Sequence, residues 1–332
     1  MAARAVIGML KSLSVKFTAV SITPQILQIN LNSLRKDENM SFLSYLINGL
    51  SLGSVYAIIA LGYTMVYGIA KMLNFAHGDV IMIGGYVTFT AMTTYGVNPI
   101  ISIIIAMIAC TVLGVLIETI AYRPLRNASS SLAVLITAIG VSYFLQNAAL
   151  LKFGAGTKSF SSVVSIPSVR LAEGKLTITG EAMVTIAACI VIMTLLLLFV
   201  NKTKPGRAML AVSEDRGTAQ LMGVNVNATI TLTFAIGAGL AAIAGVLLCS
   251  AYPSLTPTTG AMPGIKAFVA AVFGGIGSIP GALIGGLLLG IIESFAKLWL
   301  TQLSDAIVFG VLIVVLLVKP TGILGRKIQE KV

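Results

Sequence analysis

The feature that most constrains this chain is a series of apolar runs, many of them about 20 residues long, separated by short polar stretches. A helix of about that length spans the roughly 30 Å hydrocarbon core of a bilayer. Only 10% of the 332 residues are charged, against about 25% in soluble domains. The alternating segments of about ten residues that mark a membrane β-barrel are not evident. The sequence therefore predicts an all-α fold, a polytopic transmembrane helical bundle.

The apolar runs form eight membrane regions, at about 45–69, 78–95, 100–121, 132–151, 183–200, 228–250, 264–299 and 305–318. The seventh is too long for one span and contains GGIGSIPG at 274–281. Glycine is conformationally permissive and proline removes a hydrogen-bond donor, so we expect two segments there, 264–277 and 280–299, and eight to nine membrane segments in all. The loop 152–182 has two strand-like stretches, which predict a small hairpin.

The distribution of Lys and Arg predicts the orientation, because these residues gather in cytoplasmic loops. The distribution fits best with these parts of the chain inside: Arg123, Arg126, the 201–226 loop and the C-terminal tail. Counted from Met40, eleven Lys and Arg then lie inside and six outside. The net charge of +11 then reflects membrane topology rather than nucleic-acid binding. Residues 1–39 would add five basic residues outside and remove the bias. We therefore expect 1–39 to be an N-terminal extension that a mis-assigned start would explain, and 40–332 to be the transmembrane domain.

A small polar cluster lies in LNFAHGDVIMIGGYV, residues 73–87, between two apolar runs. Asn74, His77 and Asp79 lie within six positions of each other, and His77 is the only histidine. Polar groups at membrane depth usually face a cavity or each other. Two interpretations stay open. Either the cluster is a hydrogen-bonded helix start, in which Asp79 holds His77 or caps the next helix, or it lines the transport path.

Two further acidic residues lie inside apolar runs. We expect Glu118 to form a structural pair with Arg123 or Arg126. Glu293 lies deeper, on a helix whose glycines suit close helix contact, and it could face a partner subunit or the transport path. The three cysteines lack metal-ligand spacing, and no paired catalytic carboxylates or Ser/His/Asp set is evident. We therefore expect neither an enzyme nor a cofactor or metal site.

The longest polar insertion on the predicted cytoplasmic side is NKTKPGRAMLAVSEDRGTAQLMGVNVN, residues 201–227. Ser213 is a suitable N-cap, and Glu214 and Asp215 would fill the first turn, where the helix dipole favours negative charge. Gly223 is suited to follow the last turn. A helix of about nine residues is too short to be stable alone, so we expect it to dock on a partner, with packing on its own bundle as the alternative. The residues available for such a contact are Ala219, Leu221 and Met222.

The stretch GRAMLAVSEDRGTAQLMGVN resembles the cytoplasmic coupling segment of ABC importer permeases. Together with LNFAHGDVIMIGGYV, AYRPLR, FGGIGSIPGALIGGLLLGIIES and KPTGILGR, it makes residues 40–332 resemble the high-affinity branched-chain amino-acid permease family, and the LivH-type subunit rather than its LivM-type companion. The resemblance implies a multi-pass inner-membrane permease that imports leucine, isoleucine or valine. The implied partners are two ABC ATPase subunits, a second, LivM-like permease and a periplasmic substrate-binding protein.

Within this resemblance, segment 204–223 is the coupling helix, which would sit in a groove of an ATPase subunit. Arg207 and the acidic pair would make charged contacts, and Gly206 and Ala219 would permit close approach. The matching positions are Gly206, Arg207, Ala211, Glu214, Asp215, Ala219 and Gly223. The transport-path candidates are Asn74, His77, Asp79 and Glu293. The alternatives are a related urea or amide ABC importer, a self-sufficient secondary transporter or channel and, more distantly, an intramembrane enzyme.

Overall fold

The computed structural model describes residues 24–126, 131–164, 166–171 and 176–325. The chain divides into two compact units, Met1–Leu43 and Ser44–Val332, and the second contains the helical bundle. The expectation for residues 1–39 falls on the first unit, and its residues 1–23 lie outside the described part of the chain.

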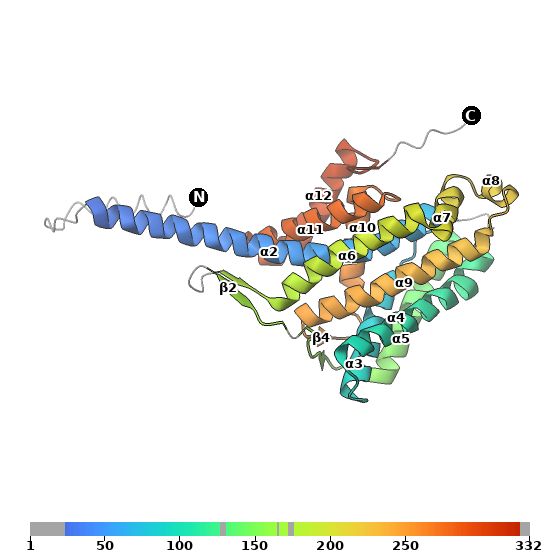
Figure 1. Cartoon of the computed structure of the whole chain (residues 1–332), viewed down its shortest axis with the longest axis horizontal. Coiled ribbons are helices and arrows are strands. Elements are labelled where there is room, and N and C mark those ends of the chain that lie inside the picture. Colours follow the sequence, from blue (N-terminus) through green and yellow to red (C-terminus); the bar gives the residue numbers. More distant parts are fainter. Residues whose placement is uncertain (1–23, 127–130, 165, 172–175, 326–332) are drawn as a thin grey trace. The chain divides into compact units, whose positions relative to one another are not determined.

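The described chain is mostly helical, as Figure 1 shows. Seven of its helices are long and apolar enough to cross a membrane, and the helix Ala261–Gly274 is apolar but shorter. The helices of the predicted membrane segments are α2 (Pro24–Ala70), α3 (His77–Thr93), α4 (Pro99–Leu116), α5 (Ser131–Phe153), α6 (Gly180–Lys202), α9 (Val226–Ala251), α10 (Ala261–Gly274), α11 (Ile279–Trp299) and α12 (Ser304–Val318). The predicted polytopic helical bundle is thus confirmed.

Short elements fill the connections between these helices. α4 continues into a π-helical turn, η2 (Ile117–Tyr122), followed by the 3₁₀ turn η3 (Arg123–Leu125), and a second 3₁₀ turn, η4 (Thr301–Leu303), precedes α12. Two short helices occupy the predicted cytoplasmic insertion, α7 (Lys204–Glu214) and α8 (Arg216–Leu221). Each begins after a side-chain cap, which explains why the polar segment is helical at all.

The expected hairpin is present in the loop between α5 and α6. β2 (Val169–Leu171) pairs antiparallel with β3 (Leu176–Ile178), with Arg170 opposite Thr177. The earlier part of the loop pairs with a distant segment instead. There, β1 (Lys158–Ser159) pairs antiparallel with β4 (Ser254–Leu255), which follows α9. Only the second half of the loop therefore forms the local hairpin.

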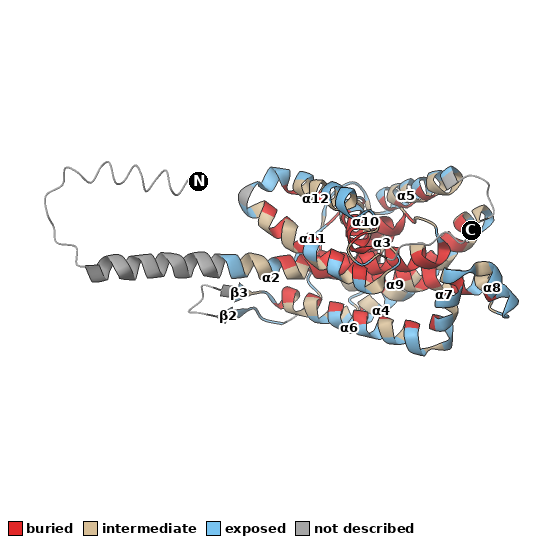
Figure 2. Ribbon diagram, turned by 90° about the horizontal axis from the view of Figure 1, so that it is seen from above, coloured by how far each residue is buried: buried red, intermediate tan, exposed pale blue. Residues whose placement is uncertain are grey.

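The interior of the bundle is built on α2 and α9. The apolar segments of these two helices are largely buried, whereas most of α5 and α12 is not. Figure 2 shows the buried residues concentrated along α2, α3 and α9. The exposed residues of α4, α5 and α6 include large apolar side chains such as Ile108, Phe144 and Leu195. Such surfaces suit the hydrocarbon core of a bilayer, where they need no further protein contact.

Small residues let α2 and α11 approach closely. A Cβ atom added at Gly290 would lie 2.2 Å from the Gly53 backbone, and one added at Gly286 would lie 2.5 Å from the Ala57 backbone. The spacing of four residues on both helices places these positions on one face of each helix. The glycine-rich helix was predicted to make close helix contacts, and its partner is α2 of the same chain.

The predicted break between α10 and α11 is confirmed. Gly275 and Gly277 have φ angles of +105° and +92°, which glycine adopts readily and other residues do not. The Ser278 hydroxyl then accepts a hydrogen bond from the Gly281 N–H at 3.2 Å and caps α11, with a proline in its first turn. The chain therefore reverses here by local glycine and cap chemistry.

Candidate functional site

The connection between α2 and α3 holds Asn74, the first residue of the predicted polar cluster. Asn74 is buried, and its side-chain oxygen Oδ1 accepts a hydrogen bond of 3.0 Å from the Tyr122 hydroxyl of η2. Its backbone carbonyl accepts the N–H of His77 at 3.1 Å. Asn74 therefore ties the loop both to the start of α3 and to the π-helical turn, a type of turn that often lies at functional sites.

His77 begins α3 and is only 2% exposed. Its ring meets the Tyr63 ring edge-on at 4.7 Å between centroids, and a Cβ added at Gly62 would lie 2.5 Å from its Nε2 atom. Gly62 in turn lies against Gly237, near the middle of α9. His77 therefore lies deep in the bundle, and its Nε2 has no hydrogen-bond partner among the residues that the structure describes.

Asp79 has a different partner from either one expected. Its Oδ1 atom accepts a hydrogen bond of 2.9 Å from the Gln146 amide of α5. The N-cap position of α3 is Ala76, which makes no side-chain cap, so Asp79 is not the N-cap residue. It does lie in the first turn of α3, where the helix dipole favours negative charge. The side chains of Asn74 and Asp79 thus have separate partners, because Asn74 bonds to η2 and Asp79 bonds to α5.

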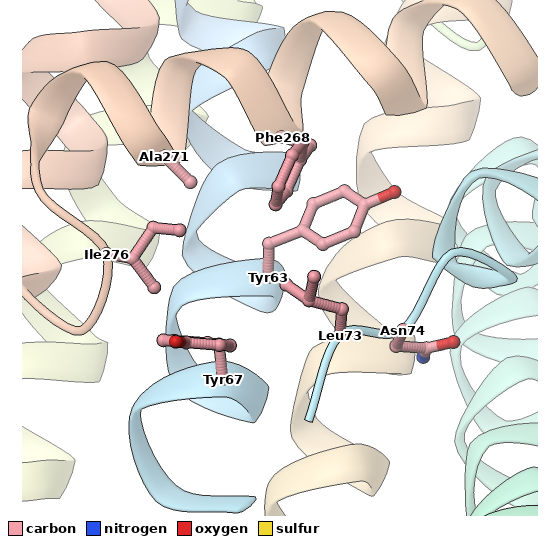
Figure 3. Close-up of a pocket in the computed structure, with 7 residues that line it drawn as sticks. All are labelled: Tyr63, Tyr67, Leu73, Asn74, Phe268, Ala271 and Ile276. Carbon is pink, nitrogen blue, oxygen red and sulfur yellow. The ribbon is translucent and has the colours of Figure 1, made fainter. Parts of the chain in front are cut away.

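A tightly closed pocket, with no free volume for even a water molecule, lies beside this cluster. Figure 3 shows the rings of Tyr63 and Phe268 next to each other at its edge, with centroids 5.8 Å apart. Pockets that hold ligands measure about 300–1,000 Å³, so this one has no room for a substrate in the present conformation. It is lined by Tyr63, Tyr67, Leu73, Asn74, Phe268, Ala271 and Ile276.

The Asp79–Gln146 bond gives a testable prediction for transport. Asp79→Ala should reduce uptake because it removes the nearer acceptor of the Gln146 amide and leaves only the Ser142 hydroxyl, at 3.3 Å, at a cost of about 1 kcal/mol. Asp79→Asn keeps an acceptor oxygen and should be milder. Gln146→Ala is the matched control and should fall between wild type and Asp79→Ala when uptake and membrane protein are measured together. Equal losses in Asp79→Asn and Asp79→Ala would show that the charge matters rather than this bond.

Glu293 is the centre of a second polar group, which includes Tyr56 of α2. It is 1% exposed, and its Oε1 atom accepts from the Lys266 and Lys297 ammonium groups at 2.9 Å and 2.7 Å. Its Oε2 accepts from the Tyr56 hydroxyl at 2.8 Å. Lys266 also pairs with Asp305 at 2.7 Å. Sequence reasoning missed Tyr56 and Lys266, because they lie 237 and 27 positions away in the chain.

This group borders a larger, open pocket of about 390 Å³. Tyr56 and Lys297 take part in its wall, whereas Glu293 lies behind them. The pocket combines apolar side chains with hydroxyl groups and one ammonium. It is lined by Leu52, Tyr56, Leu248, Tyr252, Ser254, Thr256, Thr259, Pro263 and Lys297.

The expected structural role of Glu118 is confirmed. The carboxylate is fully buried and forms ion pairs with both Arg126 and Arg123, the latter at 3.3 Å. The Thr231 hydroxyl of α9 donates to it at 2.6 Å. Burial lowers the pKa of the Arg126 guanidinium, and the charge of Glu118 acts in the opposite direction. These contacts join the end of α4 to α9, so the network stabilises the bundle.

The polar insertion forms two helices instead of the one expected, and Ser213 does not cap either of them. Thr203 caps α7 by accepting from the Gly206 N–H at 3.1 Å, and Asp215 caps α8 by accepting from the Thr218 N–H at 2.9 Å. The Ser213 hydroxyl instead donates to the Leu210 carbonyl. Glu214 ends α7 and therefore lies in its last turn, not in the first turn of the next helix.

Two of the matched positions are buried in this chain. Gly206 lies against the end of α6, where an added Cβ would come within 2.2 Å of the Phe199 carbonyl oxygen. Ala219 is 4% exposed, so the expectation that it is available to a partner is wrong. The other five matched positions are exposed. They are Arg207, Ala211, Glu214, Asp215 and Gly223.

The end of α8 is as predicted. Gly223 has a φ of +82°, its N–H bonds to the Gln220 carbonyl, and the Val224 N–H bonds to the Ala219 carbonyl. These two bonds form a Schellman motif. They leave Leu221 and Met222 facing outward, 88% and 80% exposed, so the described segment presents two adjacent apolar side chains to its surroundings.

Comparisons with known proteins match this chain to a family over most of its length. Residues 45–316 match the family described as branched-chain amino acid transport system / permease component. The high-affinity branched-chain amino acid transport system permease protein BraD of Pseudomonas aeruginosa is 46% identical over 88% of this chain and 98% of its own length. The permease protein LivH of the same kind of system in Escherichia coli K12 is 45% identical over 89% and 99%. A probable LivH of Methanocaldococcus jannaschii is 30% identical over 82% and 89%.

Proposed function

This chain belongs to the branched-chain amino acid transport permease family, and we propose that it couples ATP hydrolysis in partner subunits to amino-acid import through α7 and α8. It is a multi-pass membrane permease of an ABC transport system and not its catalytic subunit. Its relatives are named for branched-chain amino acids, which are therefore the proposed substrates: leucine, isoleucine and valine.

One observation carries this proposal: the apolar pair Leu221 and Met222 stands exposed at the end of a short capped helix. Two such side chains in water forfeit the gain from burial, and the positive-inside distribution places them on the cytoplasmic side. Arg207 and Glu214 of α7 are also exposed. A protein surface with an apolar groove and charged rims fits this segment, and an ATPase subunit is the partner that an importer needs there.

Membership in an ABC transport system implies ATPase and binding-protein partners. The finer composition belongs to the proposal: two ATPase subunits, a second permease of the LivM type and a periplasmic binding protein. The broad apolar faces of α4, α5, α6 and α12 leave room for a second permease as well as for lipid. The proposed location is the cell inner membrane.

The transport-path residues also belong to the proposal. Asn74 lines the narrow pocket, and His77 has a buried nitrogen with no partner in the described chain. Asp79 joins α3 to α5, and Glu293 holds two residues of the larger pocket wall. Buried polar groups at membrane depth commonly mark substrate pathways. A change of conformation would be needed to widen the pocket beside Asn74.

Uptake by the reconstituted complex tests the function. In liposomes that contain the chain with its ATPase and permease partners, leucine uptake is expected to require ATP on the side of the ATPases and binding protein on the other. Isoleucine and valine should compete, urea should not, and ADP-loaded liposomes serve as the control. Uptake that follows an ion gradient without ATP would indicate a secondary transporter. Competition by urea and not by valine would indicate a urea importer.

A further inference from the structure

We propose that Arg216 is the positioning residue that transmits movement of α8 to the loop between α2 and α3. This inference rests on the proposed function, because it assumes that an ATPase subunit moves α8. Beyond the proposed function, it names Arg216 as the residue through which movement of α8 reaches the pocket beside Asn74. None of the transport-path candidates lies in α8, so some contact must connect the two regions.

The first step is the contact of Arg216 with α2. Arg216 is the first residue of α8, and its guanidinium donates to the carbonyl of Ala70, the last residue of α2. The two residues lie 146 positions apart, and Ala70 is fully buried. A hydrogen bond from a charged donor is stronger than a neutral one, and a basic group suits the negative end of a helix dipole. Arg216 therefore fastens α8 to the end of α2.

The second step is the local geometry of the chain immediately after this contact. Lys71 has a φ of +53°, the one positive value of a non-glycine residue in the described ranges. Such a conformation is uncommon without glycine and stores strain. Residues 71–74 have no regular structure, and α3 begins at His77. A shift of Ala70 would therefore act on a short connection that is already strained.

The third step is the opposite anchor of that connection. The Tyr122 hydroxyl donates its one hydrogen to Asn74 Oδ1 at 3.0 Å and, more weakly, to the Leu73 carbonyl at 3.4 Å. Tyr122 is fully buried, and its ring packs on Phe234 of α9. The loop is thus held between Arg216 on the α8 side and Tyr122 on the bundle side. If α8 moves while α9 does not, the loop must deform between these two anchors.

The last step joins the loop to the pocket. Leu73 and Asn74 form part of the wall of the pocket in Figure 3, opposite α10 residues Phe268 and Ala271. The other wall residues of α2, Tyr63 and Tyr67, lie within two turns of Ala70. Movement of Ala70 relative to Tyr122 would therefore change the width of this pocket directly. Arg216 is suited to the task because its planar guanidinium is more rigid than a lysine side chain.

The experiment compares Arg216→Ala with wild type in the complete reconstituted importer, and Lys202→Ala is the control. Lys202 ends α6, is exposed and carries the same charge. In Arg216→Ala, the ATPase subunits should co-purify as in wild type and hydrolyse ATP, while the ATP used per leucine imported rises about tenfold or more. That factor corresponds to losing one charge-assisted hydrogen bond from the conformational coupling. Lys202→Ala should keep the wild-type ratio.

Three outcomes would overturn the assignment. An ATP-to-leucine ratio within about twofold of wild type would show that Arg216 does not transmit movement. Lower protein levels with an unchanged ratio would show that it only stabilises the end of α2. Loss of the ATPase subunits would make Arg216 part of the docking surface. If Arg216→Ala does not reach the membrane, Arg216→Lys keeps a donor and the charge, and it should raise the ratio by a smaller factor. Failure of ATP-driven uptake in wild type would instead reject the proposed function.

Discussion

Replacement of Leu221 and Met222 by aspartate is expected to release the ATPase subunits from the permease. Burying a leucine or methionine side chain contributes about 1.5–3 kcal/mol, so the pair should account for about 3–6 kcal/mol of the association. The expected loss of affinity is therefore about a hundredfold or more. Substrate-stimulated ATP hydrolysis should be lost with it, because the ATPases no longer contact the permease.

The fold of the permease should be unaffected by this double change, since both side chains are exposed and contribute little to its core. Gln220→Asp is the matched control: it places the same acidic group in the same last turn of α8, at an exposed polar position. The measurement is co-purification of the ATPase subunits from detergent-solubilised membranes. Wild-type retention in the double variant would mean that α8 does not form the docking surface, and the coupling proposal would lose its main support.

A cysteine introduced at Leu221 should provide the corresponding crosslink to an ATPase subunit, and one at Ala219 should not. The reason is their exposure, 88% for Leu221 and 4% for Ala219. A crosslink at Leu221 and none at Ala219 would indicate that α8 docks on the ATPase. No crosslink at either position would indicate that α8 only packs on its own bundle.

Glu293→Ala is expected to destabilise the permease by about 3–5 kcal/mol, the usual cost of removing one partner from a buried ion pair. Lys266 would keep only Asp305, and the Tyr56 hydroxyl would lose its acceptor. A change of this size should lower the midpoint of thermal unfolding by about 6 °C or more. The measurement is the loss of folded, monodisperse protein on heating in detergent.

A double variant tests whether Glu293→Ala destabilises the permease by leaving a buried charge unpaired or by removing side-chain volume. Combining Lys266→Met with Glu293→Met removes both members of the innermost pair and keeps an apolar side chain at each site, so it should recover most of the stability. Lys297 and Asp305 are partly exposed in this chain and can turn to water. An unchanged midpoint in Glu293→Ala would show that this network does not hold α2, α10 and α11 together.

The helices themselves follow from local features of the sequence. The apolar runs, the glycine and proline break before α11, and Gly223 after α8 were each predicted correctly. Each depends on residues within a few turns of one another, where apolar length, cap chemistry and positive φ act independently of the remaining fold. The family could also be recognised from the sequence, because its motifs are contiguous stretches.

The caps within the cytoplasmic segment show where local reasoning is ambiguous. Ser213, Asp215 and Thr203 are all acceptable N-caps, and the structure uses Thr203 and Asp215. Gly206 allows α7 to fold back on α6, and Met209 and Val212 of α7 are buried. The choice among equivalent caps was thus made by packing between helices.

The sequence by itself determined the membrane class of this chain, the approximate positions of its membrane helices and its family. Only the tertiary structure decided which buried polar groups meet: Asp79 with Gln146, Glu293 with Lys266 and Tyr56, and Arg216 with the end of α2. The physical reason is that helix formation depends on neighbours along the chain, whereas the low-polarity interior requires a partner for most buried polar groups. That partner is supplied by whichever helix crosses at the same depth, and it can lie more than 200 positions away.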